Sequence, residues 1–540
     1  MASNARVACL SSLVLLLCLQ SHAATPAHGF QSGRVYHDRN GSAAWDAGEP
    51  GIAGVAVSNG RDVVRTDADG RYRIAVAAGD IVFLVKPAGW RAPDCRDGLP
   101  QFWRTASGQS TTDGPAAGSG ADLDFALHRH PDSRRHGRRG LDVLVFADPQ
   151  AKSMDDVSYY ARDIVEPLRT APAADLGLTL GDVVNDVLAL YPPMIAATTS
   201  LGVPWLHAPG NHDLDPDARG DADTLATFRR VFGPDTHAWE EREATFVVLD
   251  DVVALPGQRP AYVGGLRDDQ FAFLEAYLPG VPRDRLLVLA LHIPLHDTGE
   301  GDGQDTFRPA DRTRLFALLR DFPHVLVLSG HRHAQGHYFH GAEDGWQGAR
   351  PLHEYSVGAA SGAYWSGVPD GEGIPDATMA DGTPNGYARL QVAADGAYRL
   401  SWHPARLPRD DPSFTAAMAL HAPKLLRQGA YPAWGVYANV FMGHAGTRVE
   451  YRIDGGPWLP MQHVLRPDPR LQVENARDDL AESLRGHDRS PEAEPSGHLW
   501  RGKLRTDLAA GTHVVEVRAF DEWQGEQRAR IRYRLEAASP

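Results

Sequence analysis

Gly330-His331-Arg332-His333 closes a series of five short apolar runs, each followed by polar residues that can bind a metal ion. Runs of this kind, rich in Leu and Val and separated in several places by helical patterns, are typical of buried parallel strands joined by crossovers. Residues that follow such strands gather in the crevice at the carboxyl ends of the sheet. We therefore expect five polar segments to converge on one site. In chain order, the pairs are Leu141–Phe146 before Asp148-Pro149-Gln150, Asp175–Leu180 before Gly181-Asp182, Val203–Ala208 before Gly210-Asn211-His212-Asp213, Leu286–Leu291 before His292, and His324–Ser329 before Gly330-His331-Arg332-His333.

The residue types in these segments indicate a two-metal hydrolytic centre. Carboxylate and amide oxygens together with neutral imidazoles are ligands that suit Mn, Fe, Zn or Mg rather than soft metals. A carboxylate can bridge two such ions about 3.5–4 Å apart, and the pair lowers the pKa of a bound water and neutralises charge on a phosphoryl group. Any single residue of the set is more simply explained as a loop cap or an exposed histidine. All five segments, in this order and each directly after a strand pattern, favour the metal centre.

The order Asp-x-Gln, Gly-Asp-x-x-x-Asp, Gly-Asn-His-Asp, His and Gly-His-x-His resembles that of the calcineurin-like metallophosphoesterases, from Leu141 to about Pro404. The resemblance implies a four-layer αββα core, in which two sheets face each other and helices cover the outside. It also implies two divalent metal ions, with Mn, Fe or Zn favoured, and a hydroxide between the metals that attacks in line with the leaving group. No covalent enzyme intermediate is expected.

The resemblance also implies a role for each matching residue. His212 would face the substrate and either protonate the leaving oxygen or stabilise charge in the transition state. Asp182 would bridge the two metals. Asp148, Gln150, Asp182 and His333 would hold one metal, and Asp182, Asn211, His292 and His331 would hold the other.

Two positions depart from the family pattern. Most family members have His where this chain has Gln150. An amide oxygen is a neutral and weaker ligand, so the sequence does not fix which metal binds there or whether the site is filled. The second position is the residue that orients His212, which in many relatives is an acid shortly after the bridging Asp. Asn185 and Asp186 both fit that position, and we favour Asp186 because a carboxylate stabilises an imidazolium better than an amide does.

The first 23 residues are typical of an export signal. Arg6 precedes the apolar run Val7–Leu19, and Ser21-His22-Ala23 offers small residues before a cleavage site. A lipoprotein signal through Cys18 ranks second, because the residues before it are not small. We therefore expect an exported protein, periplasmic or extracellular, with Cys95 as its one remaining thiol and no internal disulfide. No other segment is apolar enough to be transmembrane.

Two all-β modules are expected on either side of a catalytic domain at residues 141–404. Residues 30–130 resemble the B-type, prealbumin-like sandwich repeats of bacterial surface proteins, which also precede phosphoesterases in this family. Residues 413–536 contain alternating strand patterns that predict an immunoglobulin-like sandwich, with a polar and mobile insertion at 470–496. Asp38, Asn40, Ser42, Asp46 and Glu49 follow the spacing of a calcium loop, but Ala43 stands where that loop needs Gly, which favours a solvated acidic loop.

Two further segments of the catalytic domain carry expectations. Thr245–Leu249 and Val252–Leu255 flank Asp250-Asp251, which predicts a hairpin in the second sheet. Ser361–Tyr387 is dense in Gly, Asp and Pro, and a loop of this length in a compact domain is usually functional. Either it reaches the metal cleft, where Tyr364 and Trp365 could stack a sugar or base, or it packs against the C-terminal module.

Composition limits the partners. The formal net charge of −15 argues against a general nucleic-acid or anionic-membrane surface, because those need clustered Lys and Arg. The expected substrates are phosphate esters, small-molecule or phosphoprotein, with phosphomonoesters first and phosphodiesters or nucleotides behind them. The alternative of a different class is an inactive centre in a cell-envelope binding protein, which Gln150 suggests and the retained histidines oppose.

Overall fold

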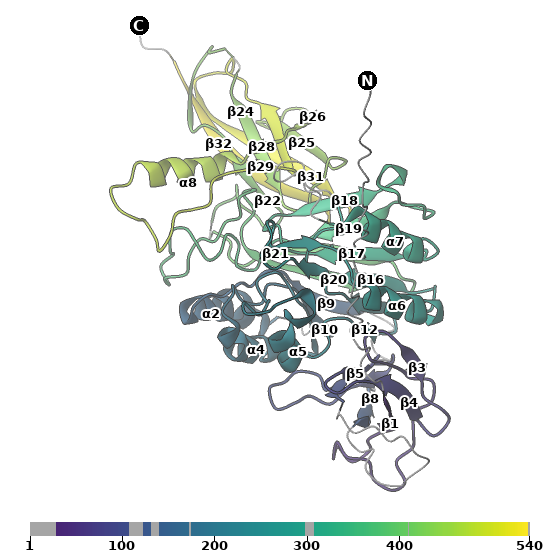
Figure 1. The fold of residues 1–540 in the computed structure, drawn as a ribbon. Helices are drawn as coiled ribbons and strands as arrows, with labels where there is room; N and C mark the ends of the chain where they lie inside the picture. The colour runs from purple at the N-terminus through teal and green to yellow at the C-terminus, as the bar shows by residue number, and fades with distance from the viewer. Residues whose placement is uncertain are drawn as a thin grey trace, which may run out of the picture.

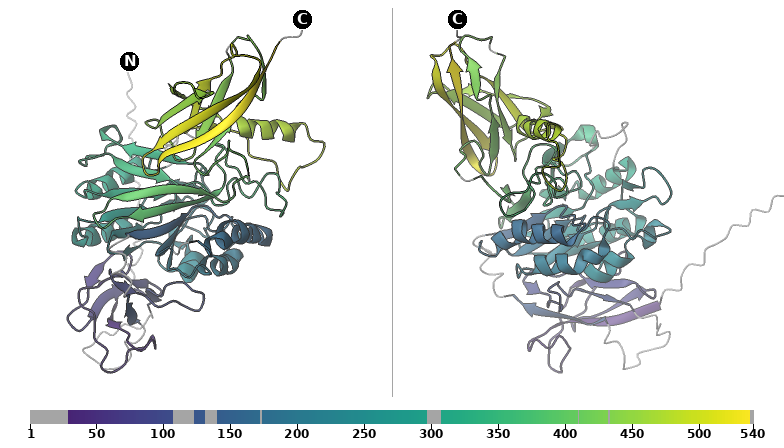
Figure 2. Two further views of the ribbon diagram at one scale, coloured as in Figure 1. Left: turned by 180° about the vertical axis from the view of Figure 1, so that it is seen from behind. Right: turned by 90° about the vertical axis from the view of Figure 1, so that its left-hand side faces the viewer.

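The computed structural model describes residues 29–106, 123–130, 140–171, 174–296, 307–408, 410–431 and 433–537. The predicted export signal, residues 1–23, lies outside the described residues. Two strand-rich modules lie at opposite ends of a mixed α/β core (Figure 1). Figure 2 shows the same order from two further sides. Within the described ranges, no helix is long and apolar enough to cross a membrane.

The core is built on two sheets. The first has the order β11-β10-β9-β20-β21, with β9, β10 and β11 parallel and β20 antiparallel to β9. The second has the order β12-β13-β16-β17-β19-β18, with β13, β16, β17 and β19 parallel. The bounds are β9 (Leu141–Phe146), β10 (Leu176–Leu180), β11 (Trp205–Ala208), β12 (His237–Glu240), β13 (Ala244–Val248), β16 (Leu286–Ala290), β17 (Val325–Ser329), β18 (Gly336–His340), β19 (Leu352–Ser356), β20 (Gly386–Val392) and β21 (Tyr398–Pro404).

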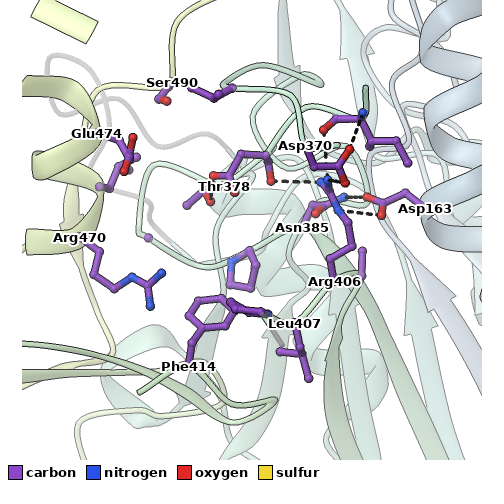
Figure 3. Close-up of a pocket in the computed structure, with 18 of the residues that line it drawn as sticks. Asp163, Asp370, Thr378, Asn385, Arg406, Leu407, Phe414, Arg470, Glu474 and Ser490 are labelled. Carbon is purple, nitrogen blue, oxygen red and sulfur yellow. Dashed lines mark hydrogen bonds and ion pairs between the residues drawn. The ribbon is translucent and has the colours of Figure 1, made fainter. Parts of the chain in front are cut away.

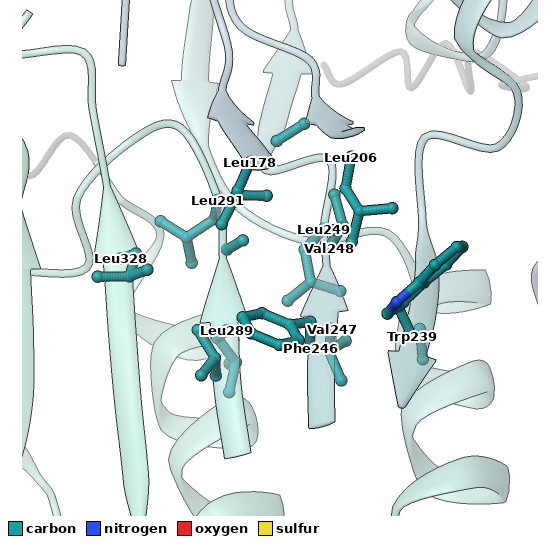
Figure 4. Packing of buried hydrophobic residues seen from close by; sticks show 14 of the residues in the cluster. Leu178, Leu206, Trp239, Phe246, Val247, Val248, Leu249, Leu289, Leu291 and Leu328 are labelled. Carbon is teal, nitrogen blue, oxygen red and sulfur yellow. The ribbon is translucent and has the colours of Figure 1, made fainter. Parts of the chain in front are cut away.

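The strands are apolar along their whole length because both faces of each sheet are covered. Leu178 and Leu206 of the first sheet belong to the same buried cluster as Phe246 and Leu289 of the second (Figure 4). On the outer face of the first sheet, Phe146 packs among side chains from α2, α4 and α5, whereas α6 and α7 cover the outer face of the second sheet. This arrangement is the predicted αββα core. The helix bounds are α2 (Met154–Tyr160), α3 (Glu166–Leu168), α4 (Tyr191–Thr199), α5 (Ala226–Phe232), α6 (Asp268–Tyr277) and α7 (Pro309–Leu319), with short 3-10 turns at Leu188–Leu190, Asp221–Asp223, Leu278–Gly280 and Ala342–Asp344.

A π-helical turn, Ala161–Val165, joins α2 to α3. It brings Asp163, which is buried, into contact with Arg406 Nε at 2.9 Å. Such turns recur at functional sites because they redirect one side chain without ending the helix. Here the redirected carboxylate also accepts a hydrogen bond from Asn385 Nδ2 at 2.9 Å, which fastens the end of the long segment that begins after β19.

The N-terminal module consists of two four-stranded sheets, β4-β1-β8-β6 and β3-β2-β5-β7. Its core is continuous with that of the catalytic domain, where Phe83 meets Phe273 with ring centroids 5.8 Å apart. Lys86 is buried in the same interface, and its Nζ lies 2.5 Å from Glu241 Oε1. The module is therefore fixed to the catalytic domain. Its strands are β1 (Gly29–His37), β2 (Ala56–Ser58), β3 (Val63–Arg65), β4 (Arg71–Val76), β5 (Ile81–Leu84), β6 (Trp90–Arg91), β7 (Trp103–Thr105) and β8 (Phe125–Arg129).

We expect Lys86→Ala to destabilise the protein by about 2–4 kcal/mol, because removing one member of a buried pair leaves the other charge unpaired. This loss of stability is smaller than that expected for a fully buried pair, because the Glu241 side chain is 21% exposed. Lys86→Met should cost less, because it removes the charge but keeps the apolar stem. Urea unfolding followed by fluorescence measures the effect.

Arg61→Ala is the matched control for that experiment. Arg61 pairs with Asp62 at 3.0 Å in the same module, but both side chains are more than 40% exposed. The control should shift stability by less than about 1 kcal/mol. Equal effects of Lys86→Ala and Arg61→Ala would contradict a buried, fixed interface.

The acidic loop of the N-terminal module uses its carboxylates on its own backbone. Asp38 accepts the N–H groups of Gly41 and Ala43, at 2.7 and 2.8 Å. Glu49 accepts the N–H of Arg39 at 2.8 Å. The carboxylates of this loop therefore cap backbone N–H groups of the loop itself.

The C-terminal module also consists of two sheets, β22-β24-β30-β27 and β23-β32-β31-β25-β26. The segment predicted as a mobile polar insertion, 470–496, begins with helix α8 (Pro469–Asp479). Asp468 caps this helix by accepting the N–H groups of Arg470 and Leu471. Leu471 is the one buried residue of α8, so few apolar positions mark this helix in the sequence. The strands are β22 (Met418–His421), β23 (Leu425–Arg427), β24 (Gly435–Val440), β25 (Arg448–Ile453), β26 (Leu459–Pro460), β27 (Gln462–His463), β30 (Leu499–Lys503), β31 (Gly511–Asp521) and β32 (Gly525–Glu536), with β28 (Arg466–Pro467) and β29 (Pro495–Ser496) forming a separate pair.

Candidate metal centre

The carboxyl ends of five strands meet at one place between the two core sheets. Asp148 follows β9, Asp182 follows β10, and Asn211 and His212 follow β11. His292 follows β16, and His331 and His333 follow β17. Contacts of 3.6 Å or less connect these segments to one another. The structure thus brings the predicted ligand residues together in one cluster.

The backbone of this cluster is held in a sparsely populated conformation. Six of the predicted site residues have left-handed φ values, between +41° and +69°. A non-glycine residue in this region costs on the order of 1–3 kcal/mol, and it persists where surrounding contacts impose it. Strained residues gathered at one place indicate a functional constraint. The six are Asp148, Gln150, Asp182, Asp186, His331 and His333.

Two glycines make room for the central carboxylate and for one histidine. A Cβ on Gly210 would lie 2.2 Å from Asp182 Oδ1, and a Cβ on Gly181 would lie 2.5 Å from His292 Nδ1. Gly181 also has φ of +89°. The glycines of the Gly-Asp and Gly-Asn-His-Asp segments are therefore required by close approach.

Around His292, four atoms with lone pairs converge. Its Nδ1 donates to the Leu180 carbonyl at 2.8 Å, which directs Nε2 into the site. Nε2 lies 3.0 Å from Asn211 Oδ1, 3.2 Å from His331 Nδ1 and 3.4 Å from Asp182 Oδ2. The ligand atoms of Asp182, His292 and His331 lie within 4.8 Å of one another. Such a group of acceptors fits a cation at its centre.

On the other side of Asp182, two buried acceptor atoms have no hydrogen-bond partner among the described residues: Gln150 Oε1 and His333 Nε2. His333 Nδ1 donates to the Gly362 carbonyl at 2.5 Å, and its Nε2 lies 3.6 Å from Asp148 Oδ1. The Gln150 amide nitrogen donates to Asp182 Oδ2 at 2.6 Å. Buried acceptors left without a donor are costly unless an ion satisfies them. The residues present therefore fit a second metal, with Asp182 common to both groups.

Protonation differs among the histidines of the cluster. Although burial opposes it, the Asp182 carboxylate raises the pKa of His292 to about 10, so metal binding at this ring requires loss of a proton. Burial raises the pKa of Asp148 to about 8, and the neighbouring Asp182 carboxylate acts in the same direction. Burial lowers the pKa of His331 to about 3 and that of His333 to about 4, so both rings are neutral near pH 7. Neutral imidazoles are the form that binds metals, and divalent ions offset the charge of crowded carboxylates.

His212 lies at the open side of the cluster. Its Nδ1 is 2.9 Å from Asp186 Oδ1, and its backbone N–H donates to Asp182 Oδ1 at 2.8 Å. The His212 side chain is 29% exposed and that of Asp186 is 71% exposed. Asn185 uses its backbone N–H on the Ala151 carbonyl. Of the two candidates for orienting His212, the structure pairs Asp186 with the ring.

Two buried carboxylates that support the cluster were not given a role from the sequence. Asp213 accepts the N–H of Gly210 at 2.9 Å, and Asp251 accepts the N–H of His292 at 2.9 Å. Asp213 was recognisable, since it ends the Gly-Asn-His-Asp segment. Asp251 was not recognisable, because the sequence pattern placed it in the turn of a predicted hairpin. That hairpin is wrong: β13 pairs with β16, and β14 (Val252–Ala254) pairs with β15 (Tyr262–Gly264).

Two tyrosines also border the cluster. Tyr364 stacks on His333 with ring centroids 4.4 Å apart and an interplanar angle of 27°, and it is 47% exposed. Tyr262 meets His331 edge-on at 6.0 Å. Tyr364 and the buried Trp365 both have φ of +56°, and Trp365 Nε1 donates to the Pro149 carbonyl at 2.9 Å. The long loop therefore reaches the metal cleft, and strained backbone turns one aromatic ring outward and the next inward.

A metal-ligand cluster at the strand ends of a two-sheet α/β core defines a metal-dependent hydrolase class. Three family models match this chain: "N terminal of Calcineurin-like phosphoesterase" at residues 39–114, "Calcineurin-like phosphoesterase" at 141–335 and "C terminal of Calcineurin-like phosphoesterase" at 354–527. The chain belongs to the calcineurin-like phosphoesterases and is a metal-dependent phosphoester hydrolase. The predicted family and its three-part layout are confirmed.

One similar solved structure is that of purple acid phosphatase PPD1, isolated from yellow lupin (Lupinus luteus) seeds. The match has 12% sequence identity, covers 65% of this chain and 67% of that chain, and has a TM-score of 0.37. No curated protein matches the chain.

Proposed function

We propose that this protein is an exported phosphomonoesterase with a dinuclear metal centre bridged by Asp182. The observation that carries the proposal is the position of Asp182 between two groups of acceptors. One group would be completed by Asp148, Gln150 and His333, and the other by Asn211, His292 and His331. The predicted ligand sets are therefore proposed unchanged, with Gln150 contributing its amide oxygen.

The bound ions would supply a water activated for attack at neutral pH and would stabilise charge on the phosphoryl oxygens. The protein supplies the acid. With its Nδ1 held by Asp186, His212 can present Nε2 to the open side of the site, where a leaving oxygen would lie. Proton donation by a positioned imidazole contributes about 10²–10⁴-fold to such reactions.

Charge at the mouth of the site supports a monoester over a polyanionic substrate. Asp186 is the most exposed residue of the predicted set, and its carboxylate would repel a second phosphate group in the leaving portion. The formal net charge of −15 would likewise repel nucleic acid, which is a polyanion. Tyr364 offers an exposed ring next to His333, which suits a planar or apolar leaving group. We therefore place phosphomonoesters with uncharged leaving groups first.

Hydrolysis of para-nitrophenyl phosphate and of its bis ester tests the proposal. Purified protein is treated with EDTA and then supplied with Mn, Fe, Zn or Mg. Metal-restored turnover with a preference for the monoester is the expected result. A preference for the bis ester would support a phosphodiesterase with the same centre. No turnover with any metal would leave either the inactive centre or an enzyme selective for another phosphate ester. For export, the signal at residues 1–23 predicts recovery of the mature chain outside the cytoplasm after cell fractionation.

We expect Tyr364→Ala to raise KM for para-nitrophenyl phosphate about 3–10-fold while kcat changes less than twofold. Loss of one aromatic stacking partner corresponds to about 0.5–1.5 kcal/mol, and it acts on binding of the leaving group. Methyl phosphate, which has no ring, should show no change in KM. Steady-state kinetics on both substrates measure the difference.

Tyr431→Ala provides the control for that experiment, because Tyr431 is 83% exposed on the C-terminal module. Its KM for both substrates should match that of the wild type. An equal rise of KM for methyl phosphate in Tyr364→Ala would show that the ring supports the centre and does not bind the leaving group.

A further inference from the structure

The segment between β19 and β20 is fastened to the metal centre at its beginning. Ser361 Oγ donates to the Asp148 carbonyl at 2.7 Å, and the Gly362 carbonyl accepts His333 Nδ1–H at 2.5 Å. Trp365 Nε1 donates to the Pro149 carbonyl. These contacts set the position of Asp148 and the orientation of the His333 ring. The placement of two proposed ligands therefore depends on where this loop lies.

The later part of the same loop is fastened to the C-terminal module through Asp381. This buried carboxylate lies 3.0 Å from His498 Nε2, and the Asp381 carbonyl accepts from Asn439 Nδ2 at 2.9 Å. The same Asp381 oxygen, Oδ2, accepts the backbone N–H of Gln335 at 2.9 Å. Gln335 follows His333 by two residues. The Asp381 carboxylate thus connects the C-terminal module to the backbone two residues after His333, a proposed ligand.

Hydrogen bonding makes the His498–Asp381 contact a charge-assisted pair. Asn439 Nδ2 faces two acceptors, the Asp381 carbonyl and Asp468 Oδ2, so its Oδ1 faces His498 Nδ1 at 2.6 Å. Nδ1 of the ring therefore donates to an amide oxygen and Nε2 donates to a carboxylate. His498 and Asn439 are both essentially inaccessible to solvent. Charge-assisted hydrogen bonds of this kind are roughly twice as strong as neutral ones.

Beside this contact, the loop and the C-terminal module are separated by a cavity of 750 Å³. Figure 3 shows Thr378 and Arg406 on one side of it, and Arg470 and Glu474 of α8 on the other. The loop is therefore not packed continuously against the module along its length. Backbone hydrogen bonds join the loop to the module on either side of the cavity, from Gly367 N–H to the Asp488 carbonyl and from Glu494 N–H to the Ala380 carbonyl. The contacts at Asp381 differ from these because buried side chains make them and because they continue to Gln335.

We propose that the C-terminal module positions the metal ligands, and that His498 and Asp381 are the positioning pair through which it acts. The inference rests on the proposed ligand set. His498 hydrogen-bonds to Asp381, and Asp381 hydrogen-bonds to Gln335. The loop that carries Asp381 in turn hydrogen-bonds to His333 and Asp148. Neither His498 nor Asp381 touches the substrate in this account.

The test compares His498→Ala with His513→Ala in the full chain. His513 is the control, since it also pairs with a carboxylate of the C-terminal module, Asp454 at 2.6 Å, but it lies on β31, in the other sheet from β24, which carries Asn439. Manganese binding to the EDTA-treated protein is measured by titration calorimetry, and kcat and KM are measured at saturating Mn²⁺. Loss of a residue that orients metal ligands typically costs 10–100-fold in metal affinity or activity.

For His498→Ala we expect Mn²⁺ affinity to fall at least about tenfold and kcat to fall, with KM within twofold of the wild type. His513→Ala should leave all three unchanged. His498→Gln, which keeps one donor for Asp381, should lie between His498→Ala and the wild type, and it replaces His498→Ala if that variant does not fold. Wild-type Mn²⁺ affinity and kcat in the folded His498 variants would overturn the inference alone, whereas a wild-type protein that binds no metal would overturn the proposed function as well.

Discussion

Asp182→Ala is expected to lower kcat/KM for para-nitrophenyl phosphate by at least about 10³-fold, equivalent to about 4 kcal/mol of transition-state stabilisation. Asp182 is the one proposed ligand common to both groups of acceptors, so its removal would affect both proposed metals at once. It also accepts the backbone N–H of His212, which places the proposed acid. Asp148 is already assigned to one of the two groups, so it does not take the place of Asp182 as the shared carboxylate.

The fold should survive this substitution. Without metal, loss of Asp182 removes its repulsion with Asp148 and Asp213, and this offsets part of the loss of its 3.4 Å contact with His292. We therefore expect Asp182→Ala and the wild type to melt within a few degrees of each other in EDTA, whereas Mn²⁺ should stabilise only the wild type. Asp321→Ala, at a carboxylate 77% exposed in the same domain, is the control and should keep full activity. Retention of more than a tenth of wild-type kcat/KM in Asp182→Ala would contradict a bridging role.

His212→Ala is expected to lower kcat by about 10²–10⁴-fold on an alkyl phosphate, because the leaving alkoxide then departs without a proton. The loss on para-nitrophenyl phosphate should be clearly smaller, since para-nitrophenolate is a weak base and needs little protonation. Steady-state kinetics of the variant on the two substrates measure this difference. Equal losses on both would assign His212 to charge stabilisation in place of proton donation.

Asp186→Asn distinguishes two roles of Asp186 in the same experiment: orienting the His212 ring and stabilising its positive charge. The amide oxygen can still accept the His212 Nδ1–H, but it cannot stabilise an imidazolium as a carboxylate does. We expect a loss of about tenfold, on the alkyl phosphate more than on the aryl ester. Wild-type kinetics in this variant would show that Asp186 has no part in the reaction.

The sequence was most informative where burial is complete. Strands such as β10 and β16 are buried along their whole length, so their apolar runs and the polar residues that follow them stand out without any knowledge of the fold. Asp182 and His292 could be singled out for this reason. Their family order then indicated the class of protein.

The sequence was least informative where function depends on contacts between distant segments. Asp251 supports His292 across 41 positions of the chain, and nothing near Asp251 distinguishes it from a turn residue. Tyr262 reaches the site from a two-stranded sheet that replaced the predicted hairpin. The loop between β19 and β20 satisfies both alternatives considered for it, since it contacts the metal centre and the C-terminal module. Such placements arise from tertiary packing, and local propensity does not encode them.

Titration of EDTA-treated protein with Mn²⁺, with activity and bound metal measured at each step, tests the dinuclear centre most directly. The structure predicts that activity rises to a plateau at two bound ions per chain, and that Asp182→Ala does not reach two. A plateau at one ion, or full activity with no bound metal, would contradict the account.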